Sequence, residues 1–168
     1  MFMRVGVISD SHYIGGAPLP KALELLQHMG VSKILHAGDV GDLSFLQALE
    51  KIAPVDIVAG NCDGLNRAES WGRKKIVEIN GVSIGLIHGD GIGDNTPSRA
   101  LKAFASQKVN AVVFGHSHQP LKEERDGIML FNPGSCKLPR GKDPRPSFGL
   151  FFIEEGKLKA DIIYFGNI

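Results

Sequence analysis

This chain of 168 residues has few cysteines, almost no net charge and no long apolar run. Only two cysteines occur, Cys62 and Cys136, and they lie far apart among loop residues. With no secretion signal in the sequence, they favour reduced thiols over a disulfide framework. The formal net charge is only +1, so nothing electrostatic demands nucleic acid or an anionic membrane as the main partner.

Neither a spanning segment nor a cleaved leader is expected. No window reaches the roughly 18 uninterrupted apolar residues of a transmembrane helix. The first apolar run is interrupted at Asp10 and His12 before the core of a signal peptide can form. Because the chain also shows no repeat, low-complexity tract or long linker, we expect a single domain over residues 1–168 of a soluble, cytoplasmic protein.

The first sixty residues contain a regular alternation of short apolar runs and helical patterns. Strands are expected at residues 4–9, 33–37 and 56–59, and helices at 19–29 and 43–52, the second capped by Asp42. The strands are apolar throughout instead of alternating with polar residues. This pattern is typical of a parallel sheet that is covered on both faces.

Turn signals of hairpins dominate the rest of the chain. They are Asn80-Gly81, Asp126-Gly127 and Glu155-Gly156, each between two runs with strand character. A helix over residues 96–107, begun by Thr96-Pro97, and a buried strand at 110–114 complete the pattern. Parallel units followed by hairpins predict one mixed sheet, or two sheets packed face to face, with helices outside.

Five of the expected strands end abruptly in polar residues. These segments are Asp10-Ser-His12, Gly38-Asp39, Gly60-Asn-Cys-Asp63, His88-Gly-Asp90 and Gly115-His-Ser-His118. In open α/β sheets, ligand and catalytic groups collect beyond the carboxyl ends of strands. We therefore expect the five loops to converge on one point.

The collected side chains are two carboxylates, one amide and four imidazoles: Asp10, His12, Asp39, Asn61, His88, His116 and His118. This mixture of oxygen and nitrogen donors suits Mn, Fe, Zn, Co or Ni. Seven groups are too many for one tetrahedral ion, but they fit two ions if one carboxylate bridges. Two adjacent ions are the arrangement used for in-line attack at phosphorus.

Each of these residues also has an ordinary structural explanation. An aspartate after a strand is usually a turn or cap residue, and Asn61 beside Gly60 fits a left-handed turn. A single His-x-His occurs often by chance, and His36, inside a strand, is expected to be a buried, hydrogen-bonded neighbour of the site. The joint pattern is harder to explain in this way, because four of the six histidines fall at strand ends.

The five segments, in this order, resemble the motifs of the calcineurin-like metallophosphoesterase superfamily: D-x-H, G-D, G-N-[HD], H-G and G-H-x-H. They run from Asp10 to His118, about two-thirds of the chain. The small size, Gly60-Asn-Cys-Asp63 and Asn132-Pro-Gly-Ser135 are most similar to the single-domain phosphodiesterase branch. That branch also includes the retromer scaffold subunit.

The resemblance implies an αββα sandwich of two mixed sheets flanked by helices, with the metal site at the carboxyl ends of strands. It implies two divalent transition-metal ions, with Mn expected and Ni, Zn, Fe or Co as alternatives. One ion would be held by Asp10, His12, Asp39 and His118, and the other by Asp39, Asn61, His88 and His116. Hydroxide activated by the metals would hydrolyse a phosphodiester or phosphomonoester, with Asp39, Asn61 and His88 acting through the metals and Asn61 also holding substrate.

Two positions depart from the family pattern. Cys62 stands where many family phosphatases carry the histidine that protonates the leaving oxygen, and a thiol with a pKa near ~8.5 is a poor acid at neutral pH. Asp90 stands where relatives of the small branch often carry a second histidine, and it could hold an imidazole or a water. Ser11 and Ser117 lie between ligands and are expected to be loop hydroxyls.

A basic segment lies beyond the motifs. Arg140, with Lys137, Lys142 and Arg145, could hold a substrate phosphate at the rim of the site, or the segment could be a solvated loop. The expected partner is a small phosphoester, and a homo-oligomer is left open. The alternatives are a non-catalytic interaction scaffold on the same fold and, more weakly, a structural role for one metal.

Overall fold

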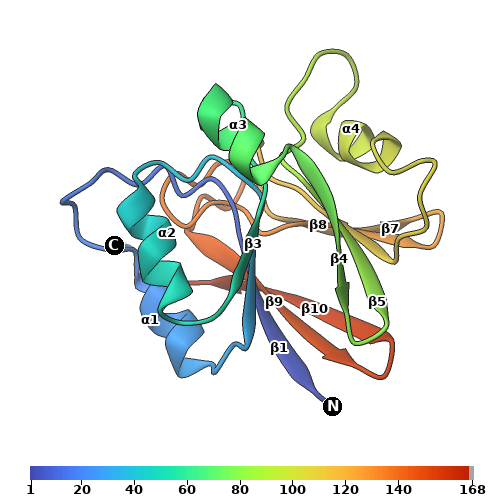
Figure 1. Cartoon of the computed structure of the whole chain (residues 1–168), viewed down its shortest axis with the longest axis horizontal. Helices are drawn as coiled ribbons and strands as arrows, with labels where there is room; N and C mark the ends of the chain where they lie inside the picture. Colours follow the sequence, from blue (N-terminus) through green and yellow to red (C-terminus); the bar gives the residue numbers. More distant parts are fainter. Residues whose placement is uncertain (167–168) are drawn as a thin grey trace.

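Two five-stranded sheets form the centre of the computed structural model, which describes residues 1–166 (Figure 1). The first sheet has the order β10-β9-β1-β2-β3, with β1 (Met3–Ile8), β2 (Lys33–His36), β3 (Val55–Ile57), β9 (Ser147–Glu154) and β10 (Lys157–Tyr164). The second has the order β4-β5-β6-β8-β7, with β4 (Lys74–Ile79), β5 (Val82–Ile87), β6 (Ala111–Val113), β7 (Leu121–Arg125) and β8 (Ile128–Asn132).

Helices cover the outer faces of both sheets. Helices α1 (Lys21–His28) and α2 (Leu43–Glu50) lie on one side of the molecule and α4 (Thr96–Lys102) on the other, while α3 (Leu65–Trp71) follows β3 (Figure 1). The expected αββα sandwich of two mixed sheets is confirmed.

Three apolar clusters correspond to the three interfaces between these layers. Leu26 and Phe45 of α1 and α2 pack in one cluster with Ile34 of β2. A second cluster between the sheets joins residues such as Val7 and Leu86. A third packs α4 and the residues after it on the second sheet. Burial of these apolar side chains is the main stabilising term of the fold.

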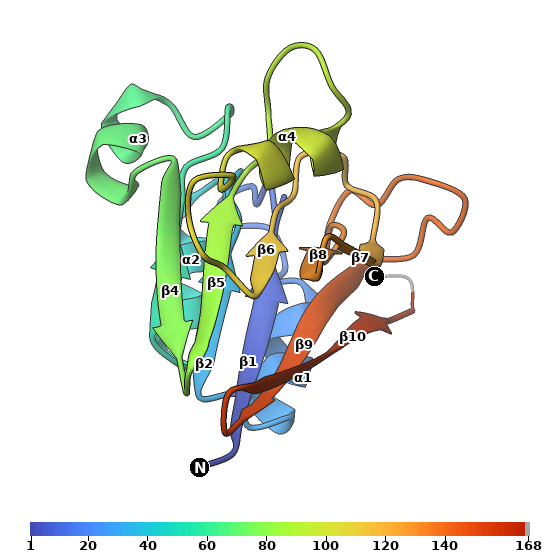
Figure 2. The same cartoon turned by 90° about the vertical axis from the view of Figure 1, so that its right-hand side faces the viewer.

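The parallel and antiparallel pairings agree with the sequence pattern. Strands β1, β2 and β3 pair in parallel, and so do β5, β6 and β8. The arrows of β1, β5 and β6 point to the same end of the molecule, away from the N-terminus (Figure 2). The three hairpin turns were also expected, and both residues of each have positive φ, as at Asn80 (47°) and Gly81 (82°).

Two helix predictions need correction, and one helix was missed. The helix expected at 96–107 ends at Lys102, and its N-cap is Asn95, whose side chain accepts the Ser98 N–H at 3.0 Å, not Thr96. The helix expected at 19–29 begins at Lys21, so Pro20 is the N-cap and not a first-turn residue. Helix α3 was not expected. Its residues are all partly or fully exposed, so they show no apolar periodicity.

Candidate metal centre

The loops after β1, β2, β3, β5 and β6 carry the seven expected ligands. The first two loops are joined by backbone hydrogen bonds from Asp10 N to Gly38 O and from His12 N to Asp39 O, both 3.0 Å. Five of the seven candidate ligands have a left-handed backbone: Asp10 (φ 52°), His12 (38°), Asp39 (57°), His116 (68°) and His118 (57°). This conformation is costly for residues other than glycine, and it occurs often at functional sites.

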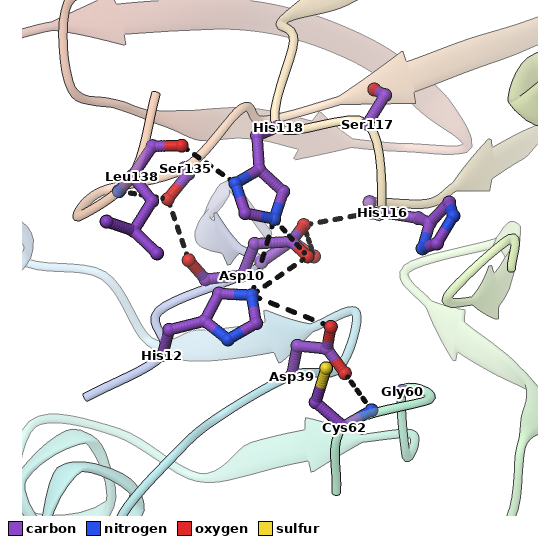
Figure 3. Close-up of polar contacts among 12 residues, drawn as sticks. Asp10, His12, Asp39, Gly60, Cys62, His116, Ser117, His118, Ser135 and Leu138 are labelled. Atoms are coloured by element: carbon purple, nitrogen blue, oxygen red, sulfur yellow. Dashed lines mark hydrogen bonds and ion pairs between the residues drawn. The ribbon is translucent and has the colours of Figure 1, made fainter. Parts of the chain in front are cut away.

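The Asp10 carboxylate is fully buried at the centre of the cluster (Figure 3). Its Oδ2 accepts hydrogen bonds from Ser9 Oγ at 2.7 Å and from the backbone N–H of His116 at 2.9 Å. Its Oδ1 lies 3.3 Å from Nε2 of His118, 3.7 Å from Nε2 of His88 and 3.8 Å from Nε2 of His12. One oxygen is therefore fixed by the protein, while the other faces three imidazoles.

The Asp39 carboxylate is arranged in the same way. Its Oδ1 accepts the backbone N–H of Cys62 at 2.8 Å. Its Oδ2 lies 3.2 Å from Nε2 of His88 and 3.6 Å from Nε2 of His12. Asp39 thus stands between a histidine of the β1 loop and a histidine of the β5 loop.

His88 and His118, whose Nε2 atoms face the carboxylates, are each oriented by a hydrogen bond from Nδ1. Nδ1 of His88 lies 2.7 Å from the carbonyl oxygen of Ala37, and Nδ1 of His118 lies 2.7 Å from that of Leu138. A carbonyl only accepts, so Nδ1 carries the hydrogen in both rings. In the neutral ring Nε2 then presents a lone pair to the site, as in metal-ligating histidines.

The remaining two ligands lie at the edge of the cluster. His116 is half-buried, its ring centroid lies 5.3 Å from that of His88, and its Nδ1 lies 3.2 Å from Oδ1 of the exposed Asn61. The structure therefore brings all seven side chains into one region. How they are divided between two ions remains a prediction.

The donor atoms fit divalent cations. Within residues 1–166, Oδ1 of Asp10 and Nε2 of His88 are buried without a hydrogen-bond partner, and a buried polar atom of this kind is costly unless something binds it. The ligand atoms of Asp10, His12 and His118 lie within 4.8 Å of one another, and so do those of Asp10, Asp39 and His88. Both sets combine carboxylate oxygen with imidazole nitrogen, as transition metals prefer.

The carboxylates and imidazoles of the cluster shift each other's pKa values. Burial by itself lowers the pKa of His88, but the close contact of its Nε2 with Asp39 and the charges of Asp10 and Asp39 outweigh burial and raise this pKa to about 9. Burial would raise the pKa of Asp10, but its histidine and serine partners lower it. A cation in the cluster would replace the imidazolium proton as the balancing charge.

Comparison with known proteins agrees with this geometry. Residues 3–156 match the model of the calcineurin-like phosphoesterase superfamily domain. The chain belongs to the calcineurin-like phosphoesterase superfamily. It is 39% identical over 165 residues to a probable metallophosphoesterase of Methanocaldococcus jannaschii, covering 96% of this chain and 81% of the relative.

Two further relatives lie in the same superfamily branch. The chain is 30% identical to phosphodiesterase YfcE of Escherichia coli, with 88% of this chain and 86% of that protein covered. Its fold matches the structure of Vacuolar Protein Sorting 29 from Cryptosporidium parvum with a TM-score of 0.74 and 25% identity, over 99% of each chain. The superfamily assignment makes the chain a metal-dependent hydrolase of phosphoesters. No helix among the described residues has the length and apolarity needed to cross a membrane.

The buried carboxylate of Asp63, a role not expected from the sequence, holds the Gly38-Asp39 and Gly60-Asn61 loops together. Asp63 accepts the backbone N–H groups of Asp39 and Gly60 at 2.7 Å and of Val40 at 3.0 Å, and Arg67 lies 3.4 Å away. Asp63 thus joins the loops after β2 and β3 beneath the ligands. Its only signal in the sequence is its place at the end of Gly60-Asn-Cys-Asp63.

His36 is buried and hydrogen-bonded beside the site, as expected. Its Nδ1 accepts the backbone N–H of Gly38 at 3.0 Å, so its Nε2 carries the hydrogen and donates to Ser11 Oγ at 2.9 Å. Complete burial lowers the pKa of His36 to about 4, which keeps the ring neutral. Ser11 Oγ in turn donates to the carbonyl oxygen of Val40. The contacts join the loops after β1 and β2.

Asn132 and Ser135 connect the loop between β8 and β9 to the site. Asn132 Nδ2 donates to Gly115 O and to Ser117 Oγ, both at 3.0 Å. Ser135 Oγ donates to the carbonyl oxygen of Asp10 at 2.7 Å (Figure 3). The Asn132-Pro-Gly-Ser135 segment therefore supports two of the ligand loops and does not itself present a ligand.

An open cavity of about 210 Å³ lies over the cluster, lined by His12, Asp39, Asn61, Cys62, His116, His118, Leu138 and Arg140. Cys62 is an exposed thiol, and both cysteines are free among the described residues. Partial burial, followed by the nearby charge of Asp39, raises the pKa of Cys62. Asp90 is exposed on the loop after β5.

The residues of the basic segment, 137–145, differ in what they face. Arg140 reaches the cavity over the cluster, whereas Lys142 lines a neighbouring cavity. Arg145 is paired with Asp143, and Lys137 is half-buried.

Proposed function

We propose that the chain hydrolyses phosphodiesters at a site whose side chains would hold two divalent metal ions, with Asp39 contributing to the binding of both. The observation that carries this proposal is the position of the Asp39 Oδ2 atom, 3.2 Å from His88 Nε2 and 3.6 Å from His12 Nε2. Two divalent cations, when bound there, supply hydroxide at neutral pH and neutralise charge on the phosphoryl oxygens. Mn²⁺ is the expected ion.

The side chains of the loops orient the ligands and the substrate. Asp10 and Asp39 each present one oxygen to the cluster because backbone N–H groups hold the other. Asn61, exposed at the edge of the cavity, can accept or donate to a phosphoryl oxygen. Arg140, at the rim, can hold the phosphate as a charge-assisted hydrogen-bond donor.

A covalent nucleophile has no place in this mechanism. Ser11 Oγ donates to the Val40 carbonyl and contacts His36, and Ser117 Oγ accepts from Asn132. Both hydroxyls are thus engaged in holding loops. Cys62 faces the cavity, but its raised pKa keeps it as a thiol near pH 7.

Diesters are favoured over monoesters because of the residue at the acid position. A thiol is a weak hydrogen-bond donor and a poor acid at neutral pH, so it gives little help to an alkoxide leaving group. The similarity to a phosphodiesterase of Escherichia coli supports the same preference.

The competing function is a non-catalytic scaffold on the same fold, which the likeness to Vacuolar Protein Sorting 29 allows. A scaffold has no need of the seven ligand side chains, and this sequence retains all seven. This retention favours the enzyme.

Hydrolysis of bis-p-nitrophenyl phosphate and p-nitrophenyl phosphate by the purified chain tests the proposal. The assay compares chelator-treated protein with protein supplied with Mn²⁺, Ni²⁺ or Zn²⁺. We expect metal-dependent turnover, faster with the diester than with the monoester. A chain that binds these metals but hydrolyses neither ester would support the scaffold instead.

A further inference from the structure

A second cavity of about 310 Å³ adjoins the one over the metal centre. It is lined by Gln119, Pro120, Arg140, Gly141, Lys142, Asp143 and Tyr164, so Arg140 borders both cavities. The lining residues come from the segment before β7, the loop between β8 and β9, and the end of β10. A molecule bound at the metal centre can therefore extend past Arg140 into this second cavity.

The wall between the cavities is fixed to a metal-ligand loop. The backbone N–H of Arg140 donates to the carbonyl oxygen of His118 at 3.0 Å, and His118 Nδ1 donates to the carbonyl oxygen of Leu138 at 2.7 Å. Gly141 then turns the chain with φ of 102°, where a Cβ atom would lie 3.2 Å from Gln119 Cγ. These contacts fix the backbone of Arg140 relative to the proposed ligands.

The second cavity has a surplus of positive charge. Its one carboxylate, Asp143, accepts hydrogen bonds from Nε and Nη2 of Arg145 at 2.8 and 2.6 Å, and the Arg145 guanidinium lies 4.5 Å from the centroid of the Tyr164 ring. Within residues 1–166, Arg140 and Lys142 form ion pairs with no carboxylate. Two cations are therefore left to face a ligand.

A third cavity, of about 290 Å³, gives a useful contrast. It is lined only by uncharged residues: Asn95, Thr96, Pro97, Phe114, Ser117, Gln119, Pro120 and Leu121. An anionic group next to the reacting phosphate is accommodated better on the side of Arg140 and Lys142 than on this neutral side.

We propose that the second cavity binds a second phosphate of the substrate, so that the preferred substrates are phosphodiesters whose alcohol carries a further phosphate. This proposal rests on the proposed function. Arg140 would lie between the two phosphates, and Lys142 would contact the second one only. Arginine and lysine are the side chains that most commonly bind phosphate. A cation that is not already paired with a carboxylate binds phosphate more strongly.

A pair of substrates with the same leaving group tests the proposal: the p-nitrophenyl ester of thymidine 5′-phosphate, with and without a 3′-phosphate. In the wild type we expect the 3′-phosphate to lower KM by about tenfold, the effect of one charge-assisted hydrogen bond. In Lys142→Ala the ratio of the two KM values should fall to near one. In the matched control Lys157→Ala, an exposed lysine at the far end of β10, the ratio should stay at the wild-type value.

Equal KM values in the wild type, or an undiminished ratio in Lys142→Ala, would overturn the proposal. Calorimetry separates its failure from that of the proposed function. Thymidine 3′,5′-bisphosphate should bind the Mn²⁺-loaded chain about tenfold more tightly than thymidine 5′-phosphate, even if turnover fails. Loss of turnover with both esters contradicts the proposed function, whereas equal affinity for the two nucleotides contradicts the second phosphate site.

Discussion

At the scale of single residues, the proposed site depends most on Asp39, whose Oδ2 lies between His12 and His88. In Asp39→Asn we expect the second metal to bind poorly and kcat to fall by at least about 10²-fold, because the bridging charge is lost. The backbone should tolerate the change, since asparagine adopts the φ of 57° found at this position more readily than most residues.

Metal content by elemental analysis and turnover of bis-p-nitrophenyl phosphate check this expectation. Asp161→Asn, at an exposed position of β10, is the matched control and should behave as the wild type. Wild-type turnover in Asp39→Asn would show that the residue does not bridge.

The thiol of Cys62 should make the enzyme sensitive to the leaving group. A histidine at this position would supply a proton to the departing oxygen, an effect of typically 10²–10⁴-fold. We expect Cys62→Ala to hydrolyse nitrophenyl esters at close to the wild-type rate, and Cys62→His to gain activity on alkyl monoesters. A large loss of nitrophenyl ester turnover in folded, metal-loaded Cys62→Ala would instead assign the thiol a catalytic role.

The raised pKa of His88 predicts how the metal-free protein responds to pH. The folded protein holds this proton more tightly than the unfolded chain does, because the pKa rises from 6.5 to about 9. The resulting stabilisation is fully present below pH 6.5 and is lost as the pH rises through about 9. His118, whose close contact with Asp10 raises its pKa, contributes in the same direction.

Denaturant unfolding of chelator-treated protein between pH 6 and 10 measures this loss, which we expect to be on the order of a few kcal/mol. The decrease in the free energy of unfolding with rising pH should be smaller in His88→Gln. It should be unchanged in the control His28→Gln, where the histidine is exposed. A flat profile for the wild type would contradict the coupling between His88 and the carboxylates.

At the scale of elements, Asp63 joins the loops after β2 and β3 by accepting three backbone N–H groups. Asp63→Ala leaves these buried donors without a partner, which should lower the free energy of unfolding by roughly 2–4 kcal/mol. Because both loops carry proposed metal ligands, metal affinity should fall as well. Denaturant unfolding and metal titration measure the two effects, with Asp161→Ala as the control. Unchanged metal affinity would mean that Asp63 only stabilises the fold.

The elements that could be predicted from the sequence are those with strong local signals. All three hairpins were expected because Asn80-Gly81 and its two counterparts adopt the positive φ angles of a tight turn. Helix α3 was missed because its residues are partly or fully exposed, and α4 ends early because its last expected turn is replaced by irregular turns after Lys102. Local patterns could not show either feature.

The convergence of side chains that follow soon after a strand, such as Asp10 and Asp39, could be predicted from the sequence. The supporting contacts were mostly not predictable, because they depend on which loops meet in three dimensions. Asp63 accepts from a residue 24 positions away, and Ser135 donates to one 125 positions away. No spacing in the sequence indicates such pairs.

At the scale of the whole molecule, both sheets contribute to the site. The first sheet supplies the loops of Asp10, His12, Asp39 and Asn61, and the second supplies those of His88, His116 and His118. The sandwich thereby sets the separation between the two groups of ligands. Asp39, from the first sheet, contacts His88, from the second, so metal binding should depend on the packing of the two sheets.

A crystal structure of the Mn²⁺-loaded chain, with anomalous scattering to locate the metals, tests the central claim most directly. The account predicts two ions roughly 3.5–4 Å apart, both in contact with Asp39 oxygens. It also predicts Asp10, His12 and His118 around one ion and Asn61, His88 and His116 around the other. A single fully occupied ion at saturating metal, or two ions without a shared Asp39 contact, would contradict the dinuclear site.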